Sequence, residues 1–196
     1  MTTQPIRNKN QIRQLAEYYL KLGQIRNYVL VTLGLHTALR ISDLLRLTWK
    51  DVYDFDRKRF RKQIELVEKK TQKPKIIALN GAIIGALTIL LDSTSAPGRA
   101  IIENNRTKKA FSRDEAYRLI RATCEALGFE YHYSCHSLRK TFGYHAWKNG
   151  ANETVLTDIF NHSFFEMTKR YLGITQDDRD AVYLDLNLYG KVLVLS

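Results

Sequence analysis

Apolar residues in the first third of the chain recur with helical spacing. Ile12, Leu15 and Tyr19 lie three and four residues apart, so they share one face of a helix. A short helix follows Ser42, which is a favourable N-cap residue. Residues 1–10 are polar, and we expect them to be flexible. The helices predicted in this part of the chain cover residues 11–20, 24–35 and about 43–47.

The period then changes from helical to alternating. Phe60, Ile64 and Leu66 fall on one face of an extended segment, with polar residues between them. A polar turn ending at Pro74 interrupts the alternation, which resumes over the next residues. This pattern predicts a strand, a turn and a second strand, with Val52–Tyr53 as a possible third strand.

Start signals mark further helices in the second half. Ser112 and Glu115 have the spacing of a capping box, and so do Ser163 and Glu166. The chain is therefore α+β, mainly α-helical with a small antiparallel β-sheet. The remaining predicted elements are helices over 80–91, 112–128, 136–149, 153–160, from 163 through Tyr171 and from Thr175 onward, and an apolar, strand-like tail over 191–196.

Composition narrows the class of protein. A chain of 196 residues, 44% of them hydrophobic, can bury one core, so we expect a single domain over residues 1–196. The two cysteines, Cys124 and Cys135, exclude a disulfide framework and a four-cysteine zinc site. No apolar run approaches the ~18 residues that cross a bilayer, and the N-terminus lacks the apolar core of a signal peptide. We therefore expect a cytoplasmic protein with reduced thiols and no membrane contact.

The charge of the chain indicates which kind of partner it binds. Lys and Arg number 31 against 20 Asp and Glu, so the net charge is +11. Such an excess favours a polyanionic partner, either nucleic acid or an anionic membrane surface. Residues that can bind a phosphate are therefore the first candidates for chemistry.

Two segments contain arginines suited to that task. Arg40 lies between two predicted helices among apolar neighbours, so it needs an anionic partner, and Asp43 offers a local salt bridge as the structural alternative. His136 and Arg139 are three residues apart on one helix face, where a cation and a titratable imidazole suit a phosphate. That spacing also occurs in helices with a purely structural role.

Two further segments become informative only in combination. His162 precedes Tyr171 by nine residues, and Lys69 and Lys70 lie at the basic turn between the predicted strands. Taken alone, a core tyrosine and a solvated turn are the simpler interpretations. A metal site built on His132, Cys135 and His136 lacks a fourth ligand, so we expect no metal.

In this order, the segments resemble the tyrosine recombinase, or phage integrase, family. The family pattern is T-G-L-R-[IP]-[SG]-E-L, a lysine on a β-hairpin, H-x-x-R, a His or Trp after L-G, and a Tyr about nine residues later. Order and approximate spacing agree over about residues 10–190. The matching segments are TALRISDLL at Arg40, KKTQK at Lys70, HSLR at His136 and Arg139, FNH at His162 and TKRYL at Tyr171.

The chain departs from the family pattern at several positions. Ala38 replaces the usual Gly, Asp43 replaces the commoner Glu, and Phe160–Asn161 replaces Leu-Gly. Lys69 competes with Lys70 for the hairpin position, and the K-T-x-K pattern favours Lys70. About ten polar residues cannot form the N-terminal core-binding domain of most integrases, so we expect the catalytic domain without it.

The resemblance implies phosphoryl transfer between DNA and a tyrosine. Tyr171 would attack the scissile phosphate, expel a 5′-hydroxyl and form a 3′-phosphotyrosine. A phenol with a pKa near ~10 is protonated at neutral pH, so it needs nearby positive charge and a base. Arg40 and Arg139 would stabilise the charge on the non-bridging oxygens, so neither a metal nor another cofactor is expected.

The other motif residues receive supporting roles from the resemblance. His136 would act as acid or base near the tyrosine hydroxyl, and Lys70 would protonate the departing 5′-oxygen. His162 would hydrogen-bond the phosphate, whereas Asp43 would orient neighbouring groups without touching DNA.

The resemblance also implies the partners. We expect double-stranded DNA with a specific recombination site, a homotetramer on that DNA and a monomer when free. The apolar tail at Val192–Leu195 would pack either on its own domain or in a neighbouring subunit. Two other functions are compatible with the fold: a DNA-binding regulator without recombination, and an enzyme of type IB topoisomerase character.

Overall fold

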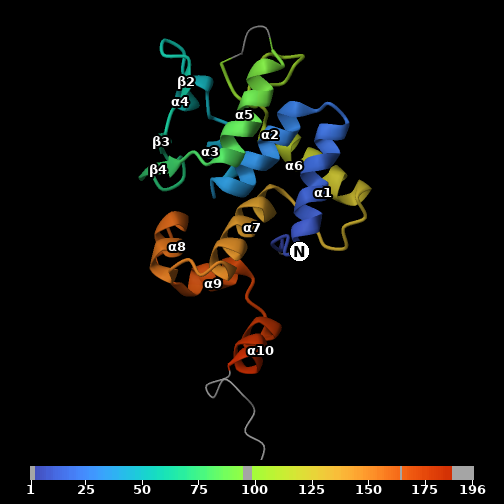
Figure 1. The fold of residues 1–196 in the computed structure, drawn as a ribbon, viewed down its shortest axis with the longest axis vertical. Coiled ribbons are helices and arrows are strands. Elements are labelled where there is room, and N and C mark those ends of the chain that lie inside the picture. Colours follow the sequence, from blue (N-terminus) through green and yellow to red (C-terminus); the bar gives the residue numbers. More distant parts are fainter. Residues whose placement is uncertain (1–2, 95–98, 164, 187–196) are drawn as a thin grey trace, which may run out of the picture.

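The computed structural model describes residues 3–94, 99–163 and 165–186. Within these ranges the chain is mainly helical, with short antiparallel strands between its N-terminal and C-terminal helices (Figure 1). The helices are α1 (Lys9–Lys21), α2 (Ile25–His36), α3 (Ile41–Leu44), α4 (Trp49–Val52), α5 (Gly81–Asp92), α6 (Arg113–Ala126), α7 (Cys135–Lys148), α8 (Glu153–Phe160), α9 (Phe165–Leu172) and α10 (Gln176–Asp185). The strands are β1 (Tyr53–Asp54), β2 (Arg59–Phe60), β3 (Gln63–Val67) and β4 (Pro74–Ala78). This architecture confirms the α+β, mainly helical class.

The strands form two antiparallel pairs rather than a single sheet. β1 pairs with β2, and β3 pairs with β4 with Ile64 opposite Ile77 and Leu66 opposite Lys75. Ile64 is fully buried, as its alternating position predicts. The possible third strand begins one residue later than expected, because Val52 ends α4.

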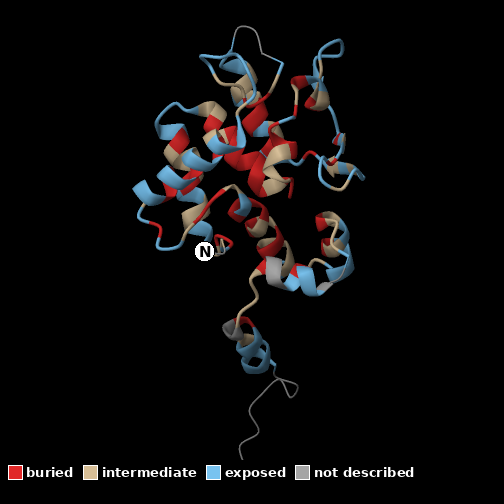
Figure 2. Cartoon of the chain, turned by 180° about the vertical axis from the view of Figure 1, so that it is seen from behind, coloured by how far each residue is buried: buried red, intermediate tan, exposed pale blue. Residues whose placement is uncertain are grey.

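The central helix of the larger core is α2. It packs against α1, α5 and α7, and its buried residues extend round most of its circumference (Figure 2). A Cβ atom added at Gly34 would lie 2.6 Å from Cδ1 of Leu138 on α7. Gly34 therefore lets α2 and α7 approach closely, which brings the loop after α2 next to the start of α7.

A second, smaller core holds α8 and α9 against α7. Leu156 and Phe160 of α8 and Leu172 of α9 are fully buried in it. Gly143 of α7 faces both helices, because a Cβ added there would lie 2.6 Å from Cζ of Phe160 and 2.7 Å from Cδ2 of Leu172. The position of α9, which contains Tyr171, thus depends on a residue without a side chain.

Most helix boundaries follow the local signals. Ser112 and Glu115 form the expected capping box of α6. Thr175 and Asp178 do the same for α10, so both start signals are confirmed. The expected Ser42 cap is wrong, since α3 begins at Ile41 and the residue before it occupies the N-cap position. The box expected at Ser163 and Glu166 includes residue 164, which lies outside the described residues.

The N-terminal segment differs from the flexible start that we expected. Ile6 is fully buried, its N–H donates to Oγ1 of Thr141 at 2.8 Å, and its carbonyl lies 3.0 Å from Nε2 of His145. The Arg7 guanidinium donates to the carbonyl of Gly173, immediately after α9. Two buried residues, Pro5 and Ile6, anchor this segment, and α7 supplies the hydrogen-bond partners of Ile6.

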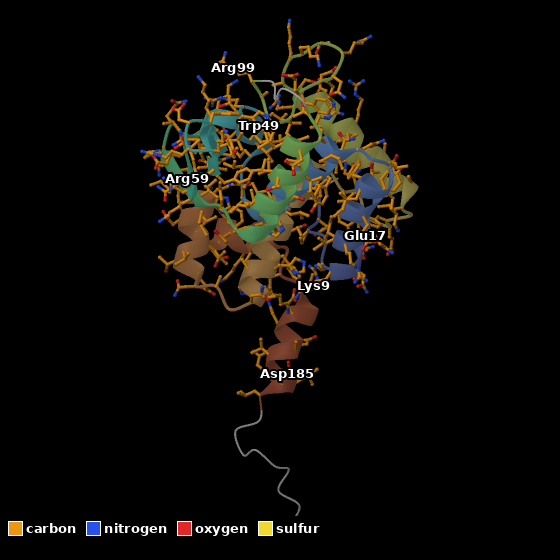
Figure 3. All side chains as sticks on the ribbon, turned by 45° about the horizontal axis from the view of Figure 1, so that its top comes forward. Lys9, Glu17, Trp49, Arg59, Arg99 and Asp185 are labelled. Carbon is orange, nitrogen blue, oxygen red and sulfur yellow. The ribbon has the colours of Figure 1, made fainter. Side chains whose placement is uncertain are left out.

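The last described helix, α10, extends away from the body (Figures 1 and 3), with Asp185 labelled at its far end. Its apolar side chains are largely exposed, including Tyr183 at 79% and Leu184 at 84%. The predicted tail over 191–196 lies outside the described residues. Among the described helices, none has the length and apolar character needed to cross a membrane.

Replacing Gly143 with Ala should destabilise the protein by about 1–3 kcal/mol, because the added methyl group overpacks the contact with Phe160 and Leu172. Urea unfolding measures the change. The matched control is Gly85→Ala in α5, where an added Cβ meets no atom within 4 Å and should stabilise the helix by roughly 0.5–1 kcal/mol. Equal stabilities for the two variants would contradict this packing.

Candidate active site

The loop after α2 places the first arginine. Ala38 adopts a left-handed backbone with φ of 52°, a conformation that explains why a glycine is common there. Arg40 then takes an extended conformation before α3, and its side chain is 21% exposed. The guanidinium binds Oε2 of Glu68 at 2.7 Å. The local alternative, a salt bridge with Asp43, is therefore wrong: Arg40 pairs with Glu68, and the Asp43 carboxylate binds the N–H of Lys69.

Asp43 fastens the β3–β4 hairpin instead. Its buried Oδ1 accepts a hydrogen bond from the backbone N–H of Lys69 at 2.9 Å. Asp43 also lies 3.7 Å from the guanidinium of Arg46. The carboxylate thus connects α3 with the turn that contains both candidate lysines.

The hairpin turn presents these lysines to solvent. Lys69 and Lys70 are both exposed and both line the groove described below. Gln72 adopts a left-handed backbone with φ of 54° and closes the turn by hydrogen bonds to residues 68 and 69. The geometry does not distinguish the two lysines, so Lys70 stays a prediction from the motif.

Helix α7 provides the histidine and the second arginine one turn apart. His136 lies in its first turn and lines the groove described below. Arg139 is buried, donates to the carbonyls of Ala38 and Phe160, and stacks over the Phe160 ring at 4.9 Å. Arg139 therefore links the loop that precedes Arg40 to the end of α8.

The turn between α8 and α9 places the third titratable group. Asn161 ends α8 with a left-handed backbone, φ 52°. His162 follows with its ring stacked on Phe160, and its Nδ1 lies 3.0 Å from Oγ1 of the buried Thr168 on α9. Residue 171 lies one turn beyond Thr168 in the same helix. The side chain of Tyr171 is outside the part of the chain that the structure describes.

These segments meet at an open groove of about 840 Å³. Its lining combines apolar side chains with a concentration of positive charge, and His162 is near enough for Arg139 and Arg40 to affect its pKa. The groove therefore has the composition expected for binding a phosphodiester. The predicted site residues that line it are Arg40, Lys70, His136 and Arg139.

The environment keeps both histidines neutral at neutral pH. Desolvation, followed by the positive charges of Lys140 and Arg139, lowers the pKa of His136 to about 4. Desolvation, followed by the charges of Arg139 and Arg40, lowers the pKa of His162 to about 4 as well. Each imidazole can then accept a proton or a hydrogen bond.

Three residues of this region were missed by the sequence analysis: Glu68, Lys75 and Thr168. Glu68 is fully buried, and the side chain of Lys75 is 9% exposed. The signal was available, because Glu68 continues the inward alternation of Ile64 and Leu66, and Lys75 pairs with Leu66. Charged residues at inward positions of a strand indicate a buried ion pair.

His132, Cys135 and His136 were the only residues that the sequence suggested for a metal site. In the described ranges, no cluster of three or more His, Cys, Asp or Glu side chains could hold a metal ion. Burial raises the pKa of the Cys135 thiol to about 12.

The family model of the phage integrases matches residues 7–177 of this chain. The chain belongs to the phage integrase family. It is 36% identical over 181 residues to the probable integrase/recombinase YoeC of Bacillus subtilis, covering 92% of this chain and 94% of that protein. It is 26% identical over 164 residues to the tyrosine recombinase XerD of Corynebacterium glutamicum, covering 81% of this chain and about half, 52%, of that relative.

Solved structures share the fold. The XerA recombinase superposes with a TM-score of 0.75 at 21% identity, over 94% of this chain and 64% of that one. The Tn1549 transposon integrase, solved with a circular intermediate DNA, gives 0.69 at 19% identity, over 95% and 67%. Family membership confirms the tyrosine recombinase assignment: the chain is an enzyme of site-specific recombination that cleaves and rejoins DNA.

The DNA-free protein should lose stability as the pH falls from about 6.5 to 4. The ordinary pKa of a histidine is 6.5 and the fold lowers that of His162 to about 4, so the unfolded state binds more protons in this range. The stability that neutral His162 contributes is therefore fully present above pH 6.5 and decreases as the pH falls below this value. Urea unfolding at several pH values measures the slope, which should be shallower in His162→Asn. Identical slopes would show that His162 titrates normally in the fold.

Proposed function

We propose that Tyr171 is the nucleophile that attacks a phosphodiester held in this groove. The observation that carries the proposal is the meeting of Arg40 from the α2–α3 loop with His136 and Arg139 from α7 at one groove, beside the turn where His162 contacts α9. Attack would form the 3′-phosphotyrosine bond and release the 5′-hydroxyl. Reversal of the same step by another 5′-hydroxyl would rejoin the DNA.

The arginines would stabilise the transition state. Negative charge increases on the non-bridging oxygens during attack, and guanidinium groups can donate two parallel hydrogen bonds to them. Arg40 lines the groove with its guanidinium held at one edge by Glu68. Removal of one such stabiliser would cost roughly 10²–10³-fold in rate.

Proton transfers would use the neutral histidines and a lysine. His136, with its lowered pKa, would accept the tyrosine proton or orient the hydroxyl. His162 would donate a hydrogen bond to the phosphate through Nε2, since its Nδ1 faces Thr168. Lys70, exposed at the hairpin turn, would protonate the departing 5′-oxygen. Asp43 would keep that turn in place through the N–H of Lys69.

The proposed partner is double-stranded DNA with a specific recombination site. The net charge of +11 supports extensive phosphate contacts. We propose a monomer in the free state and a homotetramer on DNA, linked through the exposed apolar side chains of α10. The proposed compartment is the cytoplasm. The homologous integrases and recombinases do not favour a regulator or a topoisomerase.

Tyr171→Phe should abolish the covalent protein–DNA adduct and preserve DNA binding, because only the attacking hydroxyl is removed. A denaturing gel with labelled DNA measures the adduct, and a mobility-shift assay measures binding. Tyr131→Phe is the matched control, since Tyr131 is 56% exposed and lies outside the groove lining. An adduct formed by Tyr171→Phe would identify a different nucleophile.

Replacing Val182 and Leu186 with Ser should prevent tetramer assembly on DNA without unfolding the protein. Both side chains are exposed, at 65% and 63%; Val182 lies in the last turn of α10, and Leu186 directly follows the helix. Analytical ultracentrifugation on a DNA site measures assembly. Val155→Ser controls for the loss of an exposed apolar group, because Val155 on α8 is 53% exposed. Normal tetramers in the double variant would exclude α10 as the subunit contact.

A further inference from the structure

A carboxylate lies beneath the cationic groove. Glu68, the residue directly after β3, is fully buried and is absent from the groove lining, whereas Arg40 and Arg139 line it. Burial alone would raise the pKa of Glu68, yet hydrogen bonds from Thr71, Arg40 and Asn161 hold it at about 2. A permanently ionised acid without access to solvent is costly unless donors surround it. The hydrogen-bond donors around Glu68 therefore offset the cost of burying its charge.

Each donor to this carboxylate comes from a different part of the site. Oε2 accepts from Nη1 of Arg40, from Oγ1 of Thr71 and from Nδ2 of Asn161, each at 2.7 Å. Oε1 lies 3.7 Å from Nζ of Lys75. The single carboxylate thus connects the α2–α3 loop, the hairpin and the turn that precedes His162.

The carboxylate also balances charge within the protein. Lys75 donates to the carbonyl of Ile159 at 2.5 Å, and desolvation and the charge of Arg139 lower its pKa to about 8. Arg40 contributes a further positive charge to this cluster. Mutual repulsion among these cations would move Arg40 away from the groove if no anion lay between them.

The carboxylate explains a departure from the family pattern. Asn161 stands where Gly is usual, and its left-handed backbone, φ 52°, is one that Asn tolerates better than other side chains. In this conformation, the side-chain amide of Asn161 donates a hydrogen bond to Glu68. The acid and the amide form one unit that joins Arg40 to the His162 turn.

We propose that Glu68, with Asn161, is a positioning residue that sets the place of Arg40 and of the His162 turn for strand cleavage without touching DNA. This inference rests on the proposed role of Arg40 in binding the scissile phosphate. A guanidinium held at one edge presents its other donors in a fixed direction, and a misplacement of about 1 Å can reduce a rate about 10²-fold.

The first experiment compares Glu68→Gln with Glu65→Gln, since Glu65 is exposed on β3, the strand that Glu68 directly follows. Both variants gain one unit of positive charge, so neither should bind DNA more weakly than the wild type. Only Glu68→Gln should lose cleavage, by about 10²-fold at saturating DNA in single-turnover assays. This divergence between affinity and rate identifies positioning, because structural damage would lower both. Equal cleavage by the two variants, faster cleavage by Glu68→Gln, or a parallel loss of binding and cleavage would each overturn the inference.

A double-mutant cycle tests whether Glu68 acts through Arg40. Once Arg40 is replaced by Ala, adding Glu68→Gln should reduce cleavage by a smaller factor than it does in the wild type, because only its effect on the His162 turn then remains. Additive losses would overturn the inference, whereas wild-type cleavage by Arg40→Ala alone would overturn the proposed role of Arg40 itself.

Asn161→Gly supplies the matched test on the other side of the unit. Glycine accepts the left-handed backbone, so only the amide hydrogen bond is removed. The variant should bind DNA normally and cleave more slowly than the wild type, with a loss that is not additive with that of Glu68→Gln. Wild-type cleavage by Asn161→Gly would remove Asn161 from the proposal.

Discussion

Burial of positive charge beside the groove is the constraint on which this structure depends. Arg139 is 2% exposed, so its guanidinium must find acceptors inside the protein, and it donates to the carbonyls of Ala38 and Phe160. Ala38 lies two residues before Arg40, and Phe160 lies two residues before His162. The requirement to satisfy one buried cation therefore brings the α2–α3 loop and the α8–α9 turn to the same point.

The packing around α7 makes that meeting possible. Gly34 lets α2 approach α7, and Gly143 lets Phe160 and Leu172 approach it from the other side. Small residues at these contacts keep the backbones close enough for side chains to bridge them. The N-terminal segment adds a third contact to the same helix, since Ile6 binds Thr141 and Arg7 binds Gly173 beyond α9. The tyrosine helix is thus held from several sides by residues distant in sequence.

Local sequence signals predicted the helices and strands well. They did not predict which side chains distant in sequence form hydrogen bonds or ion pairs. The capping boxes at Ser112 and Thr175 lie within one turn of the helices they start, so the sequence contains all the information needed. Arg40 instead pairs with Glu68, 28 residues away, and no local rule could prefer it over the adjacent Asp43. The motif order selected the residues that line the groove, but motif order cannot reveal which buried acid or amide supports them.

The charges of the site affect the protonation state of His162 before DNA binds. Desolvation, followed by the charges of Arg139 and Arg40, lowers the pKa of His162, so the free enzyme keeps this imidazole neutral. A bound phosphodiester anion would offset the arginine charges and so raise the histidine pKa by the part of the shift that these charges cause. Proton affinity at the site is therefore linked to occupancy of the groove. Glu68 binds one edge of the Arg40 guanidinium. The other N–H donors of Arg40 are then available to a phosphate anion in the groove.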